Sequence, residues 1–272
     1  MPSYVVTGAS RGLGFEFTRQ LAADPNNTVI GLVRDKAAAD AKAQKWGLTS
    51  VHFVEAQYTD LDSLKAATEA TKGITGGELN YLINNAASVS EVSELKTFDD
   101  FHNDFSTLEA DLLTSFRINV LAVLKTIEAF LHLLQSTPGP KKVITITSGM
   151  SDLDLINASG IAVAAPYAMS KGALNVAVAK YNALYKERGI LFLGVCPGYV
   201  ATERQTQELK SDEDQARLRA LGQKFEAFAP QFTGPISPQQ SVSEILSLAH
   251  KVSIEDGYGG AFVSRFGNKT WF

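Results

Sequence analysis

The chain has 272 residues, of which 45% are hydrophobic and 20% are charged, and its formal net charge is −4 at neutral pH. This balance is typical of a globular protein with a sizeable core, and it excludes disordered and collagen-like chains. No run of Lys and Arg is longer than the pair Lys141 and Lys142, so neither nucleic acid nor an anionic membrane is an expected partner.

Strand-like apolar runs alternate with helical patterns along nearly the whole chain. We predict strands at 4–6, 28–33, 51–54, 79–83, 143–147, 190–195 and 261–263. We predict helices near 12–23, 36–46, 60–72, 111–135, 166–187 and 238–251. Such alternation is typical of a parallel sheet covered by helices on both faces. The expected fold is therefore a doubly wound, seven-stranded α/β fold of the Rossmann type, in one domain that spans 1–272.

A glycine-rich turn follows the first predicted strand. Thr7 precedes three glycines, Gly8, Gly12 and Gly14, and an amphipathic helix comes next. Glycines let the backbone turn tightly and approach a pyrophosphate, which the helix N-terminus then binds. The turn predicts a dinucleotide site, and a glycine-rich turn without a ligand is the alternative.

Further motifs stand after later strands. Asn84-Asn85-Ala86-Ala87 follows the fourth strand and Ser148 follows the fifth. Tyr167 and Lys171 are four residues apart, which places both on one face of the next helix.

Together with Asn119 and the glycine spacing, these motifs resemble the short-chain dehydrogenase/reductase family. The segment 256–263, followed by Gly267 and Trp271, resembles its NADP-type carbonyl reductase branch, the group of the C-signal and Sniffer proteins.

The resemblance implies a catalytic set of Asn119, Ser148, Tyr167 and Lys171. Tyr167 would be the proton donor, because a nearby ammonium stabilises the phenolate and lowers a phenol pKa that is otherwise about 10. Ser148 would hydrogen-bond the substrate oxygen, and Asn119 would hold a water chain behind Lys171. Ordinary roles stay open for each: a polar group inside a helix for Asn119, a strand cap for Ser148, and an exposed helical pair for the other two.

The resemblance also implies a nicotinamide cofactor. Its binding residues would be Gly8, Ser10, Arg11, Leu13, Gly14, Arg34, Gln57, Asn85, Ala86, Arg117, Tyr167, Lys171, Pro197, Gly198, Val200 and Thr202. Arg34 stands where NAD-specific relatives have an Asp, and with Arg11 it could clamp a 2′-phosphate, so we expect NADP(H). The alternative for both arginines is a solvated surface position. Two residues depart from the family pattern: Gln57 replaces an Asp beside the adenine, and Ala87 replaces a glycine.

The stretch 203–236 is charged and is expected to be an insertion. Ser211 and Asp214 have the spacing of a capping box, and apolar residues then recur at Leu218, Leu221, Phe225 and Phe228. We expect an amphipathic helix that ends before Pro230 and closes over the substrate as a lid. A helix that covers core or an oligomer contact is the alternative.

These features predict an NADPH-dependent reductase of ketones or aldehydes. An apolar or bulky substrate would lie against Met150, Tyr199, Phe225 and Phe228, with a small insertion at 152–164 lining the mouth or forming a surface loop without contact to substrate. Two other functions stay open: a redox-silent NADP-binding sensor or partner protein, and an isomerase or cyclase that uses the same pocket.

The remaining features concern partners and compartment. Cys196 lies in an apolar sequence and is expected to be a buried thiol rather than a nucleophile. The first strand starts almost at once and no apolar run approaches about 18 residues, so we expect a cytoplasmic protein without membrane association. The four histidines form no metal-ligand cluster, so no metal is expected. The expected partner is a small-molecule carbonyl substrate, and a homo-oligomer of two or four copies is left open.

Overall fold

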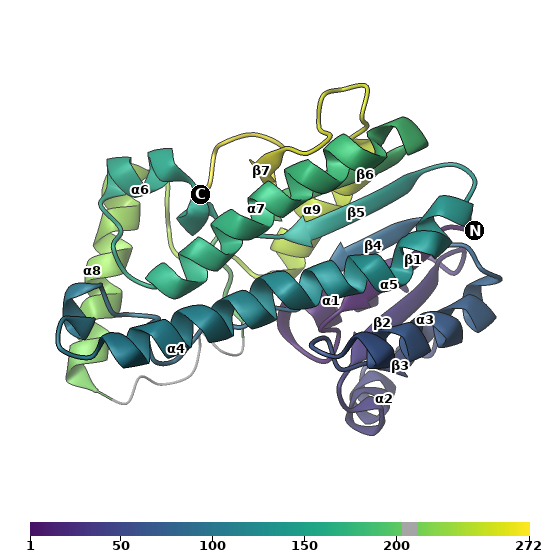
Figure 1. Ribbon diagram of the computed structural model, residues 1–272, viewed down its shortest axis with the longest axis horizontal. Coiled ribbons are helices and arrows are strands. Elements are labelled where there is room, and N and C mark those ends of the chain that lie inside the picture. Colours follow the sequence, from purple (N-terminus) through teal and green to yellow (C-terminus); the bar gives the residue numbers. More distant parts are fainter. Residues whose placement is uncertain (203–210) are drawn as a thin grey trace.

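The computed structural model describes residues 1–202 and 211–272. Its centre is a seven-stranded sheet in the order β3-β2-β1-β4-β5-β6-β7, in which all neighbours are parallel (Figure 1). The strands are β1 (Ser3–Thr7), β2 (Thr28–Val33), β3 (Val51–Glu55), β4 (Tyr81–Asn84), β5 (Lys141–Ile146), β6 (Ile190–Cys196) and β7 (Phe262–Ser264). The predicted doubly wound fold is confirmed. Its strand order reverses between β1 and β4, and such a switch point is where open α/β sheets bind ligands.

The central strands are buried on both faces. Every residue of β1 and of β6 is buried. Along β2, Val29 packs into the core on one side of the sheet and Ile30 into the core on the other, because successive side chains of a strand point to opposite faces. This two-sided burial is the reason that the strands read as continuous apolar runs.

Helices cover both faces of the sheet. The core that contains Val29 also contains Phe17 of α1 and Ile245 of α9, and the core that contains Ile30 also contains Phe130 and Leu174. The helices of these layers are α1 (Gly12–Leu21), α2 (Lys36–Lys45), α3 (Leu61–Thr75), α5 (Ala122–Ser136), α7 (Ala165–Tyr185) and α9 (Pro238–Lys251).

The long helical segment before β5 begins earlier than the predicted 111–135. Here α4 (Phe105–Phe116) starts after Asp104, whose carboxylate accepts from the Thr107 N–H at 3.3 Å, and a π-helical turn, Arg117–Leu121, joins α4 to α5. By length and composition alone the segment Phe105–Ser136 could cross a membrane, but 56% of its most apolar window is buried inside the fold. Packing against the sheet and neighbouring helices therefore accounts for its apolar composition.

Two helices pack together at one end of the molecule, α6 (Leu153–Ser159) and α8 (Asp212–Phe228) (Figure 1). No helix is predicted from the sequence at 152–164, but the carboxylate of Asp152 caps α6 there by accepting from the Leu155 N–H at 3.0 Å. The predicted helix of the insertion is confirmed as α8, which ends before Pro230, whereas residues 203–210 of the insertion lie outside the described residues. Short 3₁₀ turns lie at Asp99–Phe101, Gly149–Ser151 and Lys186–Arg188.

Candidate active site

The glycine-rich turn has a shape that only glycine fits at two positions. Gly8 has φ +68°, in the left-handed region. A Cβ on Gly14 would lie 2.1 Å from the carbonyl oxygen of Gly8, so the first turn of α1 touches the end of β1 directly. The N-terminus of α1 therefore lies at the carboxyl edge of the sheet, where a helix N-terminus can bind a pyrophosphate. The residues present therefore fit a dinucleotide.

The segment after β4 is fastened to this turn. The Thr7 hydroxyl accepts from the N–H groups of Asn85 (3.0 Å) and Ala86 (2.9 Å), and the Asn85 side chain donates to the Thr7 carbonyl at 2.9 Å. Two predicted cofactor segments thus meet at the switch point between β1 and β4. Ala87, the departure from the family pattern, is exposed.

A third segment at the carboxyl edge of the sheet follows β6 and contains Pro197, Gly198, Val200 and Thr202. Gly198 has φ +84°, and the Ser241 hydroxyl donates to the Pro197 carbonyl at 2.7 Å. The Cγ2 atom of Thr202 lies 3.8 Å from the position that a Cβ on Gly12 would take. The structure therefore brings this segment to the glycine-rich turn.

The four residues of the predicted catalytic set lie near one another at the carboxyl edge of the sheet, around the ends of β4 and β5. Lys171 is 2% exposed, and its Nζ donates to the carbonyl of Ile146 at 2.8 Å and lies 5.7 Å from the centre of the Tyr167 ring. Burial lowers the pKa of Lys171 to about 8. Ser148 follows β5, and its hydroxyl accepts from the Met150 N–H at 3.2 Å.

Asn119 lies on the π-helical turn and ties α7 to the loop after β4. Its side chain accepts from the Ser88 N–H at 2.8 Å and donates to the Ser88 carbonyl at 2.9 Å and to the Ser170 hydroxyl at 3.0 Å. The Ser170 hydroxyl donates in turn to the Tyr167 carbonyl at 2.7 Å. Asn119 thus fixes the first turn of α7, which carries Tyr167.

A cavity of 210 Å³ opens beside Ser148 and Tyr167. Three of the four predicted substrate residues line it, namely Met150, Tyr199 and Phe225. Leu155 and Ala164 also line it, as expected for the insertion 152–164 at the mouth of the substrate site. Trp271 and Phe272 line it too, and the sequence analysis does not assign them to the substrate site.

Phe228 does not line the cavity. Phe225 is buried, with its ring centre 4.7 Å from that of Phe272, whereas Phe228 lies one turn further along α8 and is 37% exposed. The helix passes the edge of the cavity after Phe225, so we do not carry Phe228 into the proposed substrate site.

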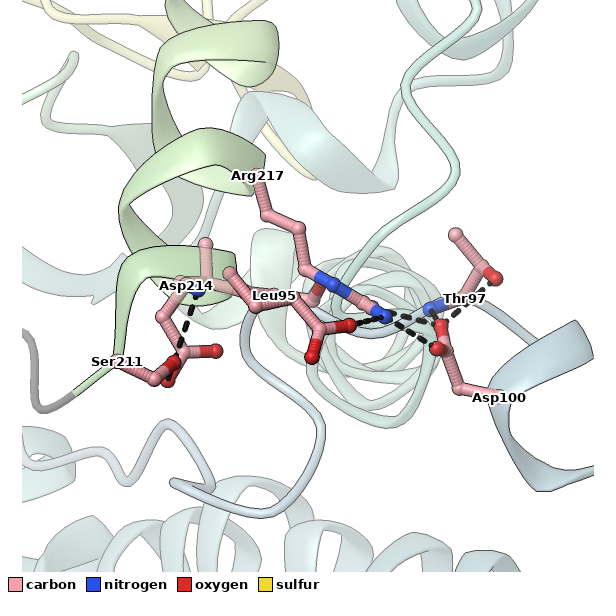
Figure 2. Close-up of polar contacts among 7 residues, drawn as sticks. Leu95, Thr97, Asp100, Ser211, Asp214 and Arg217 are labelled. Atoms are coloured by element: carbon pink, nitrogen blue, oxygen red, sulfur yellow. Dashed lines mark hydrogen bonds and ion pairs between the residues drawn. The ribbon is translucent and has the colours of Figure 1, made fainter.

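An ion-pair network holds α8 against the loop before α4 (Figure 2). The guanidinium of Arg217 makes two bonds to the carboxylate of Asp100, at 2.6 and 2.8 Å, and donates to the Leu95 carbonyl at 3.1 Å. These bonds, together with the Thr97 N–H, hold the pKa of Asp100 well below its usual range. At the start of the same helix, the Ser211 hydroxyl accepts from the Asp214 N–H at 3.0 Å, so the predicted cap is present.

Positive side chains surround the outer part of the glycine-rich turn. Arg11 and Arg34 are exposed, and neither has a carboxylate partner in the part of the chain that the structure describes. Lys42 donates to the Ser10 carbonyl at 3.2 Å, which adds a cation that the sequence did not single out.

The other predicted cofactor residues are less closely tied to this cluster. Leu13 packs against a core cluster, Gln57 is exposed and donates its backbone N–H to the Ser63 hydroxyl at 2.9 Å, and Arg117 is exposed on the π-helical turn.

Cys196 is buried beside the cavity, as predicted. Its Sγ accepts from the Gly149 N–H at 3.1 Å, and burial raises the pKa of the thiol. A thiol in this state is a poor nucleophile, which supports a packing role.

Comparison with known proteins places this site in a family. Residues 3–213 match the family model described as short chain dehydrogenase. The chain belongs to this family. Short chain dehydrogenase virK of Hypocrea virens is 45% identical over 273 residues, which cover 100% of both chains. The crystal structure of an NADPH-bound carbonyl reductase from chicken fatty liver matches with a TM-score of 0.76 at 25% identity, over 98% of each chain. Carbonyl reductase Sniffer of D. melanogaster matches with the same TM-score at 20% identity, over 98% of each chain, and shows the fold.

In this short-chain dehydrogenase, several residues of the site were missed by sequence reasoning. The sequence analysis uses Trp271 only for the family resemblance and does not use Phe272. The signal that points to this cavity wall is that the two aromatic residues are adjacent. Tyr58 follows directly on Gln57, and its hydroxyl lies 2.6 Å from both the Gly8 nitrogen and the Leu32 oxygen. No local sequence pattern predicts that contact, because it joins segments at the ends of three different strands.

Proposed function

We propose that this short-chain dehydrogenase reduces a ketone or aldehyde to an alcohol with NADPH. The observation that carries the proposal is the cavity lined by both Ser148 and Tyr167, with the buried ammonium of Lys171 bound to the end of β5 beside them. Such a set suits a reaction in which negative charge develops on one substrate oxygen and a proton follows.

Each residue of the set has a distinct part in the proposed reaction. The Ser148 hydroxyl hydrogen-bonds the carbonyl oxygen of the substrate and stabilises its developing charge. Tyr167 donates the proton to that oxygen, and the Lys171 ammonium favours the phenolate that is left. Asn119 keeps the turn of α7 in place through Ser170. NADPH, when bound, supplies the hydride.

The preference for NADPH rests on charge. Arg11, Arg34 and Lys42 form a positive border around the glycine-rich turn, which suits a 2′-phosphate. The NADPH-bound carbonyl reductase of similar structure supports the same choice.

An apolar substrate of some bulk fits the cavity best. Its wall away from the sheet is formed by Leu221, Phe225 and Phe272, and the ring centres of Tyr199 and Phe225 lie 5.4 Å apart. Burial of apolar area stabilises such a complex by about 25 cal/mol per Å².

A first experiment tests the reaction. Oxidation of NADPH is followed optically over a panel of small and bulky ketones and aldehydes. We expect turnover with bulky apolar carbonyls. Binding of NADPH without turnover of any carbonyl would instead support a sensor, and product formation without net cofactor oxidation would support an isomerase or cyclase.

A second experiment tests the cofactor. Dissociation constants for NADPH and NADH are measured for the wild type and for Arg34→Asp. The wild type should prefer NADPH, and the variant should shift toward NADH, because the carboxylate repels the 2′-phosphate. An unchanged ratio would mean that Arg34 does not touch the phosphate.

A further inference from the structure

Tyr58 joins three neighbouring strands at the carboxyl edge of the sheet. It lies three residues after the end of β3, and its hydroxyl donates to the carbonyl of Leu32 in β2 at 2.6 Å. The same oxygen accepts from the N–H of Gly8, directly after β1, at 2.6 Å. One side chain thus reaches from β3 across β2 to the glycine-rich turn.

Both bonds lie at the start of the turn. The Gly8 N–H follows directly on β1 and Tyr58 supplies its acceptor, while the Leu32 carbonyl also accepts from the Ala9 N–H at 3.1 Å. Burial raises the pKa of Tyr58 to about 12, so the hydroxyl keeps its proton at neutral pH and can donate to Leu32 while it accepts from Gly8.

The turn is held from two sides. On the β4 side, a Cβ on Gly8 would already lie 3.0 Å from the Cα of Ala86. On the β2 side, the Tyr58 hydroxyl fixes the Gly8 amide. The first residue of the turn therefore has little freedom to move, even without a ligand.

The position of this bond points to the cofactor. Dinucleotides bind outside the carboxyl ends of the strands, with the pyrophosphate on the glycine-rich turn. Arg34 directly follows β2, two residues after Leu32, which places the proposed phosphate clamp near the carbonyl that the Tyr58 hydroxyl binds. A loop already ordered in its binding shape loses less conformational entropy when a ligand arrives.

We propose that Tyr58 is a positioning residue of the cofactor site, whose hydroxyl holds the glycine-rich turn in the shape that accepts the adenosine and pyrophosphate half of the dinucleotide. This proposal rests on the proposed function only in that the site binds a dinucleotide, and it needs no carbonyl chemistry.

Tyr58→Phe removes the hydroxyl and keeps the ring. The matched control is Tyr4→Phe. Tyr4 is a buried tyrosine near the amino-terminal end of β1, away from the glycine-rich turn, and its hydroxyl lies 3.2 Å from Nε2 of His250. Dissociation constants are measured for NADPH and for adenosine 2′,5′-bisphosphate, and thermal unfolding is followed without ligand. Removal of the hydroxyl breaks both of its hydrogen bonds and leaves the Gly8 amide without this acceptor, which predicts an increase in both constants on the order of tenfold for Tyr58→Phe. Tyr4→Phe should lower the melting temperature to a similar extent and leave both constants unchanged.

Unchanged affinity in Tyr58→Phe, or an equal loss in Tyr4→Phe, would overturn the proposal. If Tyr58→Phe does not fold, hydrogen exchange in the cofactor-free wild type decides instead: the Gly8 amide should exchange slowly, and exchange as fast as that of an exposed loop amide overturns the proposal. A wild type that binds neither probe would overturn the assigned cofactor and this proposal together. Absence of carbonyl reduction alongside the tenfold effect would overturn only the proposed reaction.

Discussion

The ionisation of Lys171 gives a prediction that can be tested without any substrate. Its ammonium is buried, and burial lowers its pKa from 10.5 to about 8. This difference corresponds to about 3 kcal/mol by which the buried charge destabilises the cofactor-free fold at neutral pH. Between these two pKa values the unfolded chain binds the proton and the folded protein does not, so stability rises with pH through this window. From pH 8 to pH 10 the gain from this residue should be about 2 kcal/mol.

The assay compares the wild type with Lys171→Met by denaturant unfolding at both pH values. The variant also loses the hydrogen bond from Nζ to the Ile146 carbonyl, but to a first approximation that loss lowers the free energy of unfolding by the same amount at both pH values. The stability of the wild type relative to the variant should therefore rise by about 2 kcal/mol between the two conditions. Lys180→Met on the same helix is the control, since its exposed ammonium is hydrated in the folded protein. Parallel pH profiles for the wild type and Lys171→Met would refute the reasoning.

Two further predictions concern α8, which we propose as a lid over the substrate. Phe225→Ala should raise the KM for bulky ketones far more than for small ones. Phe228→Ala is the matched control outside the cavity, and since among the described residues Phe228 contacts the cavity wall only through the ring of Phe272, with ring centres 6.2 Å apart, its effect should be much smaller; equal effects of the two variants would contradict the proposed lid. Asp100→Asn removes the charge that Arg217 binds, and since ion pairs near the surface contribute about 0.2–1 kcal/mol, the KM should rise by at most about fivefold. High salt should raise the KM of the wild type toward that of the variant and leave the KM of the variant nearly unchanged. A KM that depends equally on salt in both proteins would show that this ion pair does not hold α8 in place.

Much of the fold could be predicted because its signals are local. The strands are two-sided apolar runs, as in β6, and the glycine-rich turn stands directly between β1 and α1. The start of α4 is missed because Asp104 comes well before the apolar pattern that defines the helix. The π-helical turn around Asn119 depends on bonds to Ser88 and Ser170, which are distant in sequence.

The site shows the same division. The predicted catalytic set could be proposed because its motifs follow one another along the chain in the order found in the family. Contacts between distant segments cannot be predicted from any single motif. Tyr58 acquires its place only when β3, β2 and β1 lie side by side, and Phe272 becomes a wall of the cavity only when the segment after β7 returns to α8. Helical spacing groups Phe228 with Phe225, whereas the direction in which α8 passes the cavity separates them.

The proton donor is the centre of the proposed reaction, and one variant tests it most directly. Tyr167→Phe keeps the ring and removes the hydroxyl that faces the cavity beside Ser148. Turnover of the best carbonyl substrate and the dissociation constant of NADPH are measured for the wild type and the variant under the same conditions. We predict that kcat falls by roughly 10²–10⁴-fold, as is typical when a general acid is lost, while the dissociation constant of NADPH stays nearly the same. Near-wild-type turnover in Tyr167→Phe would contradict the role of Tyr167 and, with it, the proposed mechanism.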